Sequence, residues 1–239
     1  RTAWFVLAAG LVVIMLLFQL LTLFLTRERV TTKPETTPLR ELFQVIYRND
    51  QLMWVTLAMV AYMSGYIITT SFGLYYFKYI FGDEGAYPIF AAILGITQIV
   101  ALAAFPLVSK FLKRRQIHLV ATILCLIGYV FFLLSGTSLA LVAVAGIFLF
   151  TGQGAVQLLM VMFIADSVEY GHWKLGRRNE SVTFSLQPFI YKLSNAVASG
   201  VVGATLILSG IDVAVSADDV TDRGAFILRV SMMVLPMVL

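Results

Sequence analysis

The sequence predicts an all-α membrane protein with about seven transmembrane helices, and three observations support this fold class. Hydrophobic residues make up 60% of the 239 residues and charged residues only 13%, whereas a soluble domain carries about 25% charged residues. The apolar residues form runs long enough to cross a hydrocarbon core, which takes about 20 helical residues. Basic residues gather in every second loop between these runs. A water-soluble core is therefore excluded, and basic residues confined to loops do not indicate nucleic-acid binding.

The apolar runs follow one another along the whole chain. Spans are predicted at Trp4–Leu25, Gln51–Phe81, Ala86–Ser109, Ile117–Leu134, Leu139–Ala165 and Thr183–Leu208, and a seventh begins at Ala225–Leu239. We accordingly expect a first span within residues 1–26, a central loop at 27–50, and a helical bundle at 51–239 whose last span is cut short. Because the chain opens with Arg1 and stops inside an apolar run, we interpret it as a fragment of a longer polytopic protein.

The central loop contains a predicted amphipathic helix. Thr37 can cap this helix and Pro38 suits its first position. Apolar residues then follow at helical spacing, namely Leu39, Leu42, Phe43, Ile46 and Tyr47. Such a helix can lie on the membrane surface or pack against its own protein, and the sequence leaves both readings open.

The charge difference between the loops predicts the orientation. Basic residues occur in the first, third and fifth loops, at Arg27, Arg29, Lys33, Arg40, Arg48, Lys110, Lys113, Arg114, Arg115, Lys174, Arg177 and Arg178. The sixth loop is acidic instead, with Asp212, Asp218, Asp219 and Asp222 against Arg223. Since basic loops face the cytoplasm, residue 1 is expected outside, and the central loop and the C-terminal end on the cytoplasmic side.

Lys192 is the strongest candidate for a functional residue. It lies about ten residues into its span, roughly 15 Å deep at 1.5 Å per residue, where a lysine costs about 2.5–3.5 kcal/mol. It belongs to a polar stripe along one helix, formed by Ser185, Pro188, Lys192, Asn195 and Ser199, with Gln187 and Tyr191 beside it. This stripe should face the protein interior or a water-filled cavity. The alternative is a structural lysine paired with a carboxylate of another helix, but intramembrane ionisable groups favour a functional role.

Four uncharged polar residues in other spans are further candidates for a binding site. Gln153 and Gln157 lie in an apolar helix, where their amides either line the same cavity or bond to neighbouring helices. Tyr62 and Tyr66 share one face of the second span. They could contact a sugar, although core packing is the more common role for such a pair.

The most polar part of the chain is Asp166–Ser181, which we expect to be a loop. Its charges alternate in sign, with Asp166, Glu169 and Glu180 against Lys174, Arg177 and Arg178. A loop that only sets orientation needs no acidic residues. The mixture therefore suggests ion pairs that form in one conformation and break in another, as in a cytoplasmic gate. A solvated loop with incidental ion pairs is the alternative.

The sequence lacks the motifs of catalytic sites. No HExxH, GxSxG or nucleotide-binding loop is present, His118 and His172 are far apart, and Cys125 is the single cysteine. We therefore expect neither an enzyme nor a resident cofactor or metal. A retinal protein would also carry an intramembrane lysine, but it needs a carboxylate at similar depth, and no predicted span has one.

The polar segment and the helix after it carry a family resemblance over about Ala165–Gly203. The match consists of Ala165-Asp166-Ser167-Val168-Glu169-Tyr170-Gly171, Trp173-Lys174, Gly176-Arg177-Arg178, Glu180-Ser181, Phe184-Ser185, Gln187 and Lys192. This pattern resembles the glycoside–pentoside–hexuronide:cation symporter family, which includes the melibiose permease and belongs to the major facilitator superfamily. Members have about twelve spans in two six-helix halves. By this resemblance the chain is the sixth span, the central cytoplasmic loop and the C-terminal half.

The resemblance implies symport of a sugar or glycoside with Na⁺ or H⁺, by alternating access, in a bacterial inner membrane. In the family, the helix that matches Phe184–Gly203 helps line the sugar cavity. Gln187 and Lys192 are therefore implied to bind substrate, and Lys192 to link the sugar and cation sites. The main cation site is implied to lie in the N-terminal half of the same protein. That half and the lipid bilayer are the partners implied for this bundle. A transporter-like sensor or lipid-handling protein on the same fold is the alternative function.

Overall fold

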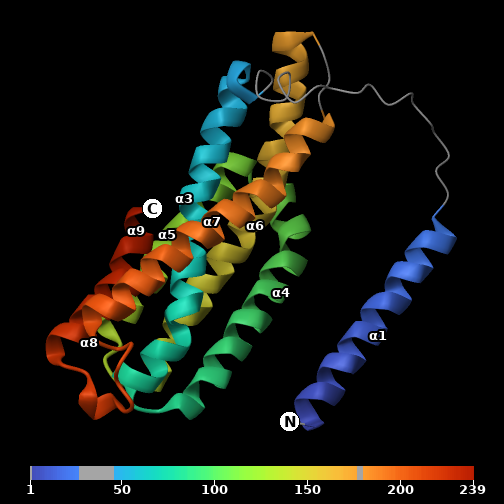
Figure 1. Cartoon of the computed structure of the whole chain (residues 1–239). Coiled ribbons are helices and arrows are strands. Elements are labelled where there is room, and N and C mark those ends of the chain that lie inside the picture. Colours follow the sequence, from blue (N-terminus) through green and yellow to red (C-terminus); the bar gives the residue numbers. More distant parts are fainter. Residues whose placement is uncertain (1, 27–45, 177–179) are drawn as a thin grey trace. The chain divides into compact units, whose positions relative to one another are not determined.

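The computed structural model describes residues 2–26, 46–176 and 180–239, and most of them are helical (Figure 1). The chain divides into two compact units, Arg1–Pro38 and Leu39–Leu239. In the first unit, the described residues form one helix, α1 (Thr2–Leu25). Its length and apolar composition suffice to cross a membrane, as the sequence predicts for Trp4–Leu25.

The second unit is a bundle of helices. Its first part comprises α3 (Asp50–Tyr76), the π-helical turn η1 (Phe77–Phe81), the short η2 (Glu84–Ala86) and α4 (Tyr87–Phe111). Its second part comprises α5 (Arg114–Leu134), α6 (Leu139–Leu175), α7 (Glu180–Ser209), η3 (Ala217–Asp219), α8 (Asp222–Arg229), η4 (Val230–Val234) and α9 (Leu235–Val238).

The predicted fold class is confirmed. With α1, six helices in the described part of the chain are long and apolar enough to span a membrane. The seventh predicted span, Ala225–Leu239, corresponds to the consecutive elements α8, η4 and α9. The amphipathic helix predicted in the central loop lies mostly outside the described residues, of which Ile46–Arg48 are helical.

The length of α6 corrects the prediction of a loop at Asp166–Ser181. The helix continues past Ala165 to Leu175, and α7 begins at Glu180. At 1.5 Å per residue its 37 residues extend about 55 Å, well beyond a hydrocarbon core of about 30 Å. The charged residues of the last turns stay helical because water can solvate them there, and an apolar run in the sequence marks only the part inside the membrane.

Helices α5 and α6 pack closely because glycines line their contact. A Cβ atom added at Gly128 would lie 2.6 Å from the backbone N of Leu149, and one at Gly152 would lie 2.5 Å from the carbonyl O of Ala121. Small residues at such contacts are typical of membrane helices, since they let the backbones approach. Helix α6 also contacts α3, α4 and α7, so it is the central helix on which the candidate site is built.

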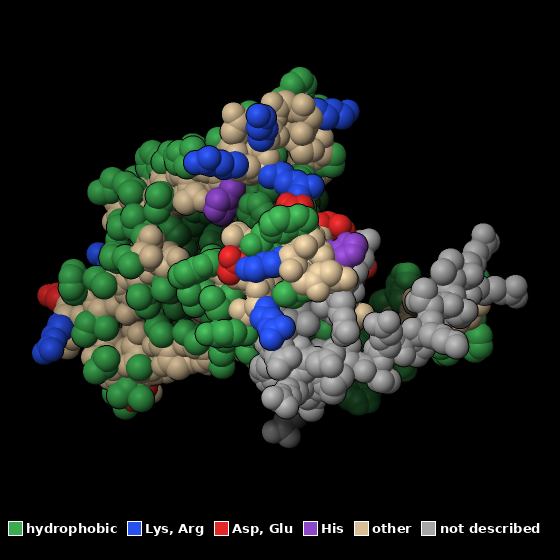
Figure 2. Space-filling view, turned by 90° about the horizontal axis from the view of Figure 1, so that it is seen from above, with side chains coloured by type: hydrophobic (Ala, Val, Ile, Leu, Met, Phe, Trp, Pro, Cys, Tyr) green, Lys and Arg blue, Asp and Glu red, His purple; other side chains and the backbone are tan. Residues whose placement is uncertain are grey.

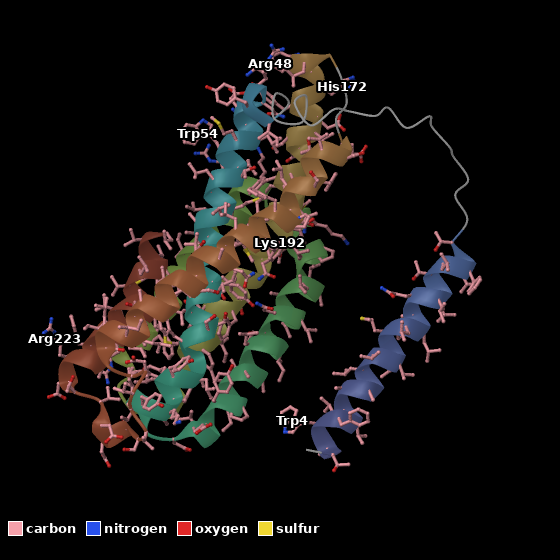
Figure 3. All side chains as sticks on the ribbon, viewed as in Figure 1. Trp4, Arg48, Trp54, His172, Lys192 and Arg223 are labelled. Atoms are coloured by element: carbon pink, nitrogen blue, oxygen red, sulfur yellow. The ribbon has the colours of Figure 1, made fainter. Side chains whose placement is uncertain are left out.

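Basic side chains gather at one end of the bundle. Arg48 and His172 lie at this end, whereas Arg223 lies at the other (Figure 3). Viewed from the first end, the surface carries several Lys and Arg side chains, with hydrophobic side chains covering much of the flanks (Figure 2). Loops that alternate in charge along the sequence therefore lie at opposite ends of the bundle.

Candidate functional site

The polar stripe of α7 faces away from its own bundle. All of its members are exposed, namely Ser185, Pro188, Lys192, Asn195 and Ser199. The opposite face packs mainly on α3, and there the Ser194 hydroxyl donates a hydrogen bond to the Val60 carbonyl at 3.1 Å. The stripe thus forms one continuous face, but that face is open rather than enclosed within the described part of the chain.

Lys192 lies near the middle of α7 (Figure 3). It forms no hydrogen bond or ion pair with any described residue. Asn195, almost one turn further, donates its amide N–H to the Tyr191 carbonyl of the same helix at 2.8 Å. An ammonium group at the depth of an apolar span needs water, an anionic group or a polar ligand. Helix α7 therefore presents a cation that nothing in the described part of the chain neutralises.

A small cavity of about 10 Å³ brings three predicted site residues together between α6 and α7. Gln157 comes from α6, and Gln187 and Tyr191 come from α7, with Met59 of α3 completing one wall. Neither glutamine side chain forms a hydrogen bond with a described residue. A volume of this size accommodates about one water molecule. The two amides can therefore offer their donors and acceptors to a ligand that approaches the open side of α7.

A second cavity, of about 550 Å³, lies between α3, α5, α6 and residues 236–239. Tyr62, Tyr66 and Gln153 line it. The Tyr62 hydroxyl and the Gln153 Oε1 atom are buried without a hydrogen-bond partner among the described residues. Met59 and Met160 line both cavities. The predicted site residues therefore divide into two groups on opposite sides of these methionines.

Gln98 of α4 is a polar residue that the sequence analysis did not single out. Its Nε2 donates a hydrogen bond to the Tyr66 hydroxyl of α3 at 3.3 Å, and the side chain is half-buried. A lone amide in the middle of an otherwise apolar span was the available signal, the same signal that selected Gln153 and Gln157. The predicted site residues therefore include none from α4.

Two ion pairs join the basic end of the bundle. Asp166 of α6 accepts hydrogen bonds from the Arg114 guanidinium at the start of α5. Lys174 near the end of α6 pairs with Asp50 at the start of α3 at 2.7 Å. All four side chains are partly exposed to solvent, so water screens both pairs and each contributes little to stability. Their effect is to position the long charged extension of α6 against two neighbours in its own bundle.

The other residues of the predicted gate have different positions. Glu169 lies on α6 and Glu180 opens α7. Arg177 and Arg178 lie outside the described residues. Close by, the buried Asn49 side chain donates to the Ser167 carbonyl at 2.9 Å, which fastens the start of α3 to the same stretch of α6.

Comparisons with known proteins identify the family. The sequence profile of the MFS/sugar transport protein family matches residues 1–239. The raffinose carrier protein of Pediococcus pentosaceus is 35% identical over 204 residues, which cover 85% of this chain and 32% of the relative. The lactose permease of Leuconostoc lactis is 31% identical over 197 residues, covering 82% of this chain and 30% of the relative. The isoprimeverose transporter of Lactiplantibacillus pentosus is 30% identical over 216 residues, covering 87% and 44%.

The chain spans about a third of the length of the first two of these relatives. Its match to the family profile, by contrast, includes every residue. The similarity therefore covers α1 and the helical bundle together, along with the segment from Ala165 to Gly203 that carried the original resemblance. The chain belongs to the MFS/sugar transport protein family, within the major facilitator superfamily, and the resemblance to glycoside–pentoside–hexuronide:cation symporters is confirmed.

Proposed function

We propose that the protein of which this chain is part is a secondary active transporter, which imports a sugar or glycoside together with Na⁺ or H⁺ by alternating access. The observation that carries this proposal is Lys192, which lies on the open polar face of α7 and forms no ion pair with any described residue. An apolar helix that presents a cation and a polar stripe away from its own bundle suits one wall of a water-filled path. The printed names of the relatives, a raffinose carrier, lactose permeases and an isoprimeverose transporter, supply the substrate class.

Lys192 has two chemical roles in this proposal. Its ammonium group donates up to three hydrogen bonds, which suit sugar hydroxyls. It also requires a negative charge in the same path, because an uncompensated cation is costly at that depth. The N-terminal half of the same protein would supply the opposite wall, with the carboxylates that bind the coupling cation. Lys192 would then link the sugar site to the cation site.

The neighbouring residues fit a carbohydrate ligand. Gln157 and Gln187 each offer an amide donor and a carbonyl acceptor, as a ring of hydroxyl groups demands. The Tyr191 ring provides an apolar surface for the C–H face of a pyranose. Asn195, Gln153, Tyr62 and Tyr66 complete the proposed set, although Tyr62 and Gln153 line the cavity behind Met59 and Met160 and would act indirectly.

The cytoplasmic gate is also a proposal. Asp166, Glu169, Arg177, Arg178 and Glu180 fall within a short stretch of sequence. Of these, Asp166 and Glu169 lie on α6 and Glu180 opens α7. Asp166 already pairs with Arg114 in this structure. A change of the gate between its open and closed states would therefore move Asp166 from Arg114 to a different basic partner. Basic loops at the end of the bundle that carries Asp166 would place the gate in the cytoplasm of a bacterial inner membrane, with residue 1 outside and the C-terminal end of the chain inside.

The test uses the full-length transporter, purified in detergent. Thermal stability is measured with a panel of mono- and disaccharide glycosides, each with and without Na⁺. We expect at least one sugar to raise the melting temperature, and to raise it more when Na⁺ is present, because two ligands that bind the same state stabilise it jointly. A shift that is indifferent to Na⁺ would point to proton coupling. If no sugar shifts the melting temperature, the sugar proposal is wrong, and a sensor or lipid-handling role replaces it.

A further inference from the structure

The helical segment that follows the acidic loop changes its winding along its length. Helix α8 continues into the π-helical turn η4, after which the Leu235 N–H bonds to the Val230 carbonyl, five residues back. Pro236 then lies in the first turn of α9. Sharp bends in helices arise mainly at prolines and π-helical turns, and π-helical turns are frequent at functional sites. The stretch from η4 to Pro236 is therefore the part of this segment that can bend.

Pro236 deprives one carbonyl of its usual donor. Proline has no backbone N–H, so the carbonyl of Met232, four residues earlier, lacks the donor that an α-helix would supply. Met232 is fully buried, and an unpaired carbonyl is costly in such surroundings. The Thr69 hydroxyl of α3 donates to this carbonyl at 3.2 Å. A side chain of a neighbouring helix thus provides the donor that the proline lacks.

Thr69 has a second acceptor within reach. Its hydroxyl also lies 3.1 Å from the Gly65 carbonyl of its own helix, but it carries a single proton. The Tyr129 hydroxyl of α5 lies 2.7 Å from the Thr69 oxygen, and it can donate to Thr69 whichever carbonyl receives the Thr69 proton. Thr69 can therefore release the Met232 carbonyl and still form two hydrogen bonds.

Close packing at the same level couples this segment to α3. A Cβ atom added at Gly65 would lie 3.3 Å from the Cα of Pro236, so the two backbones are in close contact there. Tyr66, the next residue of α3, lines the large cavity together with Pro236. Helix α3 also contributes Met59 to the small cavity. A bend at Pro236 would therefore displace a helix that lines both cavities.

We propose that η4 and Pro236 form a hinge in the transport cycle, and that Thr69 is its latch. In the latched state Thr69 donates to the Met232 carbonyl. In the released state the hinge bends, and Thr69 donates to the Gly65 carbonyl instead. This inference rests on the proposed sugar transport, since alternating access requires elements with two arrangements. It assigns a conformational role to residues that need not contact the sugar.

A double-mutant cycle tests the latch. Thermal unfolding is measured on the full-length transporter in detergent, with Thr69→Val, Pro236→Ala and both substitutions together. Thr69→Val should lower the melting temperature by roughly 2–4 °C, because the Met232 carbonyl and the Tyr129 hydroxyl each lose a partner. In the Pro236→Ala background a new N–H can bond to the Met232 carbonyl, so Thr69→Val should lower the melting temperature by only about half as much. Equal losses in both backgrounds would overturn the latch.

Uptake of radiolabelled sugar into vesicles tests the hinge. Pro236→Ala should lower the maximal rate about tenfold and leave the sugar dissociation constant unchanged within about twofold, because an unbroken helix resists bending. A proline with a merely structural role would not separate these two quantities. Pro106→Ala is the matched control, since Pro106 lies inside the α-helix α4 and is exposed. It should leave the rate and the dissociation constant unchanged.

Thr69 variants provide a second route if Pro236→Ala does not fold. Thr69→Val should slow uptake without a change in sugar affinity, and Thr69→Ser, which keeps the hydroxyl, should restore the rate. Uptake at the wild-type rate by Pro236→Ala, or by Thr69→Val where it replaces that variant, would overturn the hinge while the transport proposal stands. A wild-type protein that neither binds nor takes up any sugar of the stability screen would overturn both.

Discussion

The large cavity behind α3 and the open face of α7 hold similar kinds of polar residue in opposite surroundings. The Tyr62 hydroxyl and the Gln153 carbonyl oxygen are buried inside the bundle, whereas Lys192 and Asn195 are exposed on the outside of it. A polar residue in an apolar span can therefore have either role. The feature that separates the two is whether the residue faces its own bundle or the region that a second half would cover.

The largest expected effect comes from Lys192. Lys192→Ala in the full-length transporter should lower the uptake rate about 10- to 100-fold, because hydrogen bonds from a charged donor contribute about 1.5–3 kcal/mol each. Gln153→Leu, on the cavity side, should keep uptake within about threefold of the wild type, a change below 1 kcal/mol. Uptake of radiolabelled sugar into vesicles measures both. Wild-type uptake by Lys192→Ala, with unchanged cation dependence, would remove the functional distinction between the two regions.

Glycines provide a stability test of the same contrast. Gly152→Ala places a Cβ atom 2.5 Å from the Ala121 carbonyl oxygen, and overpacking of this kind costs about 1–3 kcal/mol. Gly200 on the open face of α7 has nothing within 4 Å of an added Cβ. Gly200→Ala should therefore leave the free energy of unfolding unchanged or raise it by up to about 1 kcal/mol through helix propensity, and the melting temperature should stay the same or rise. Thermal unfolding in detergent compares them. A loss of stability in Gly200→Ala would indicate that this face is closely packed in the full-length protein.

The buried hydroxyl of Tyr62 should contribute nothing to stability. Tyr62→Phe removes an oxygen that has no hydrogen-bond partner among the described residues, so stability should be unchanged or rise by up to about 1 kcal/mol. The same substitution should change sugar affinity by no more than about threefold, since Tyr62 lines the cavity behind Met59 and would act only indirectly. A clear loss of sugar affinity in Tyr62→Phe, with stability retained, would assign the cavity to the transport path.

The loop between α7 and α8 provides a smaller effect on stability for comparison, and it belongs to neither region. Hydrogen bonds from the backbone N–H and the hydroxyl of Ser216 hold the pKa of Asp219 below its ordinary value of 3.8. The ionised carboxylate therefore stabilises the folded loop above that value, and the stabilisation is lost as the pH falls through the lowered pKa. Asp219→Asn should lower the melting temperature slightly at pH 7, and the difference from the wild type should shrink as the pH falls below 3.8 and through the lowered pKa of Asp219. A difference that persists at low pH would show that the loop depends on the side-chain shape rather than on the charge.

The candidate site was only partly predictable, and Gln153 and Gln157 show why. The two residues are chemically identical and lie four apart on one helix, so the sequence treats them as neighbours on one face. In the structure Gln153 lines the cavity on one side of Met59 and Met160, and Gln157 lines the cavity shared with α7. A difference of about 40° around the helix axis, four residues at 3.6 per turn, is enough because two different helices pack there.

The sequence by itself determined the membrane environment, the positions of the spans, the charge difference between the two ends and the family. The first three follow from local composition, since a bilayer selects apolar runs of a given length and the loops between them carry the charges. The family follows from the motif resemblance over Ala165–Gly203. Only the tertiary structure decided that α6 extends beyond the membrane, that Asp166 pairs with Arg114, and that Gln98 reaches Tyr66. These contacts join residues far apart in the chain, and they depend on which helices lie side by side, which no local pattern specifies.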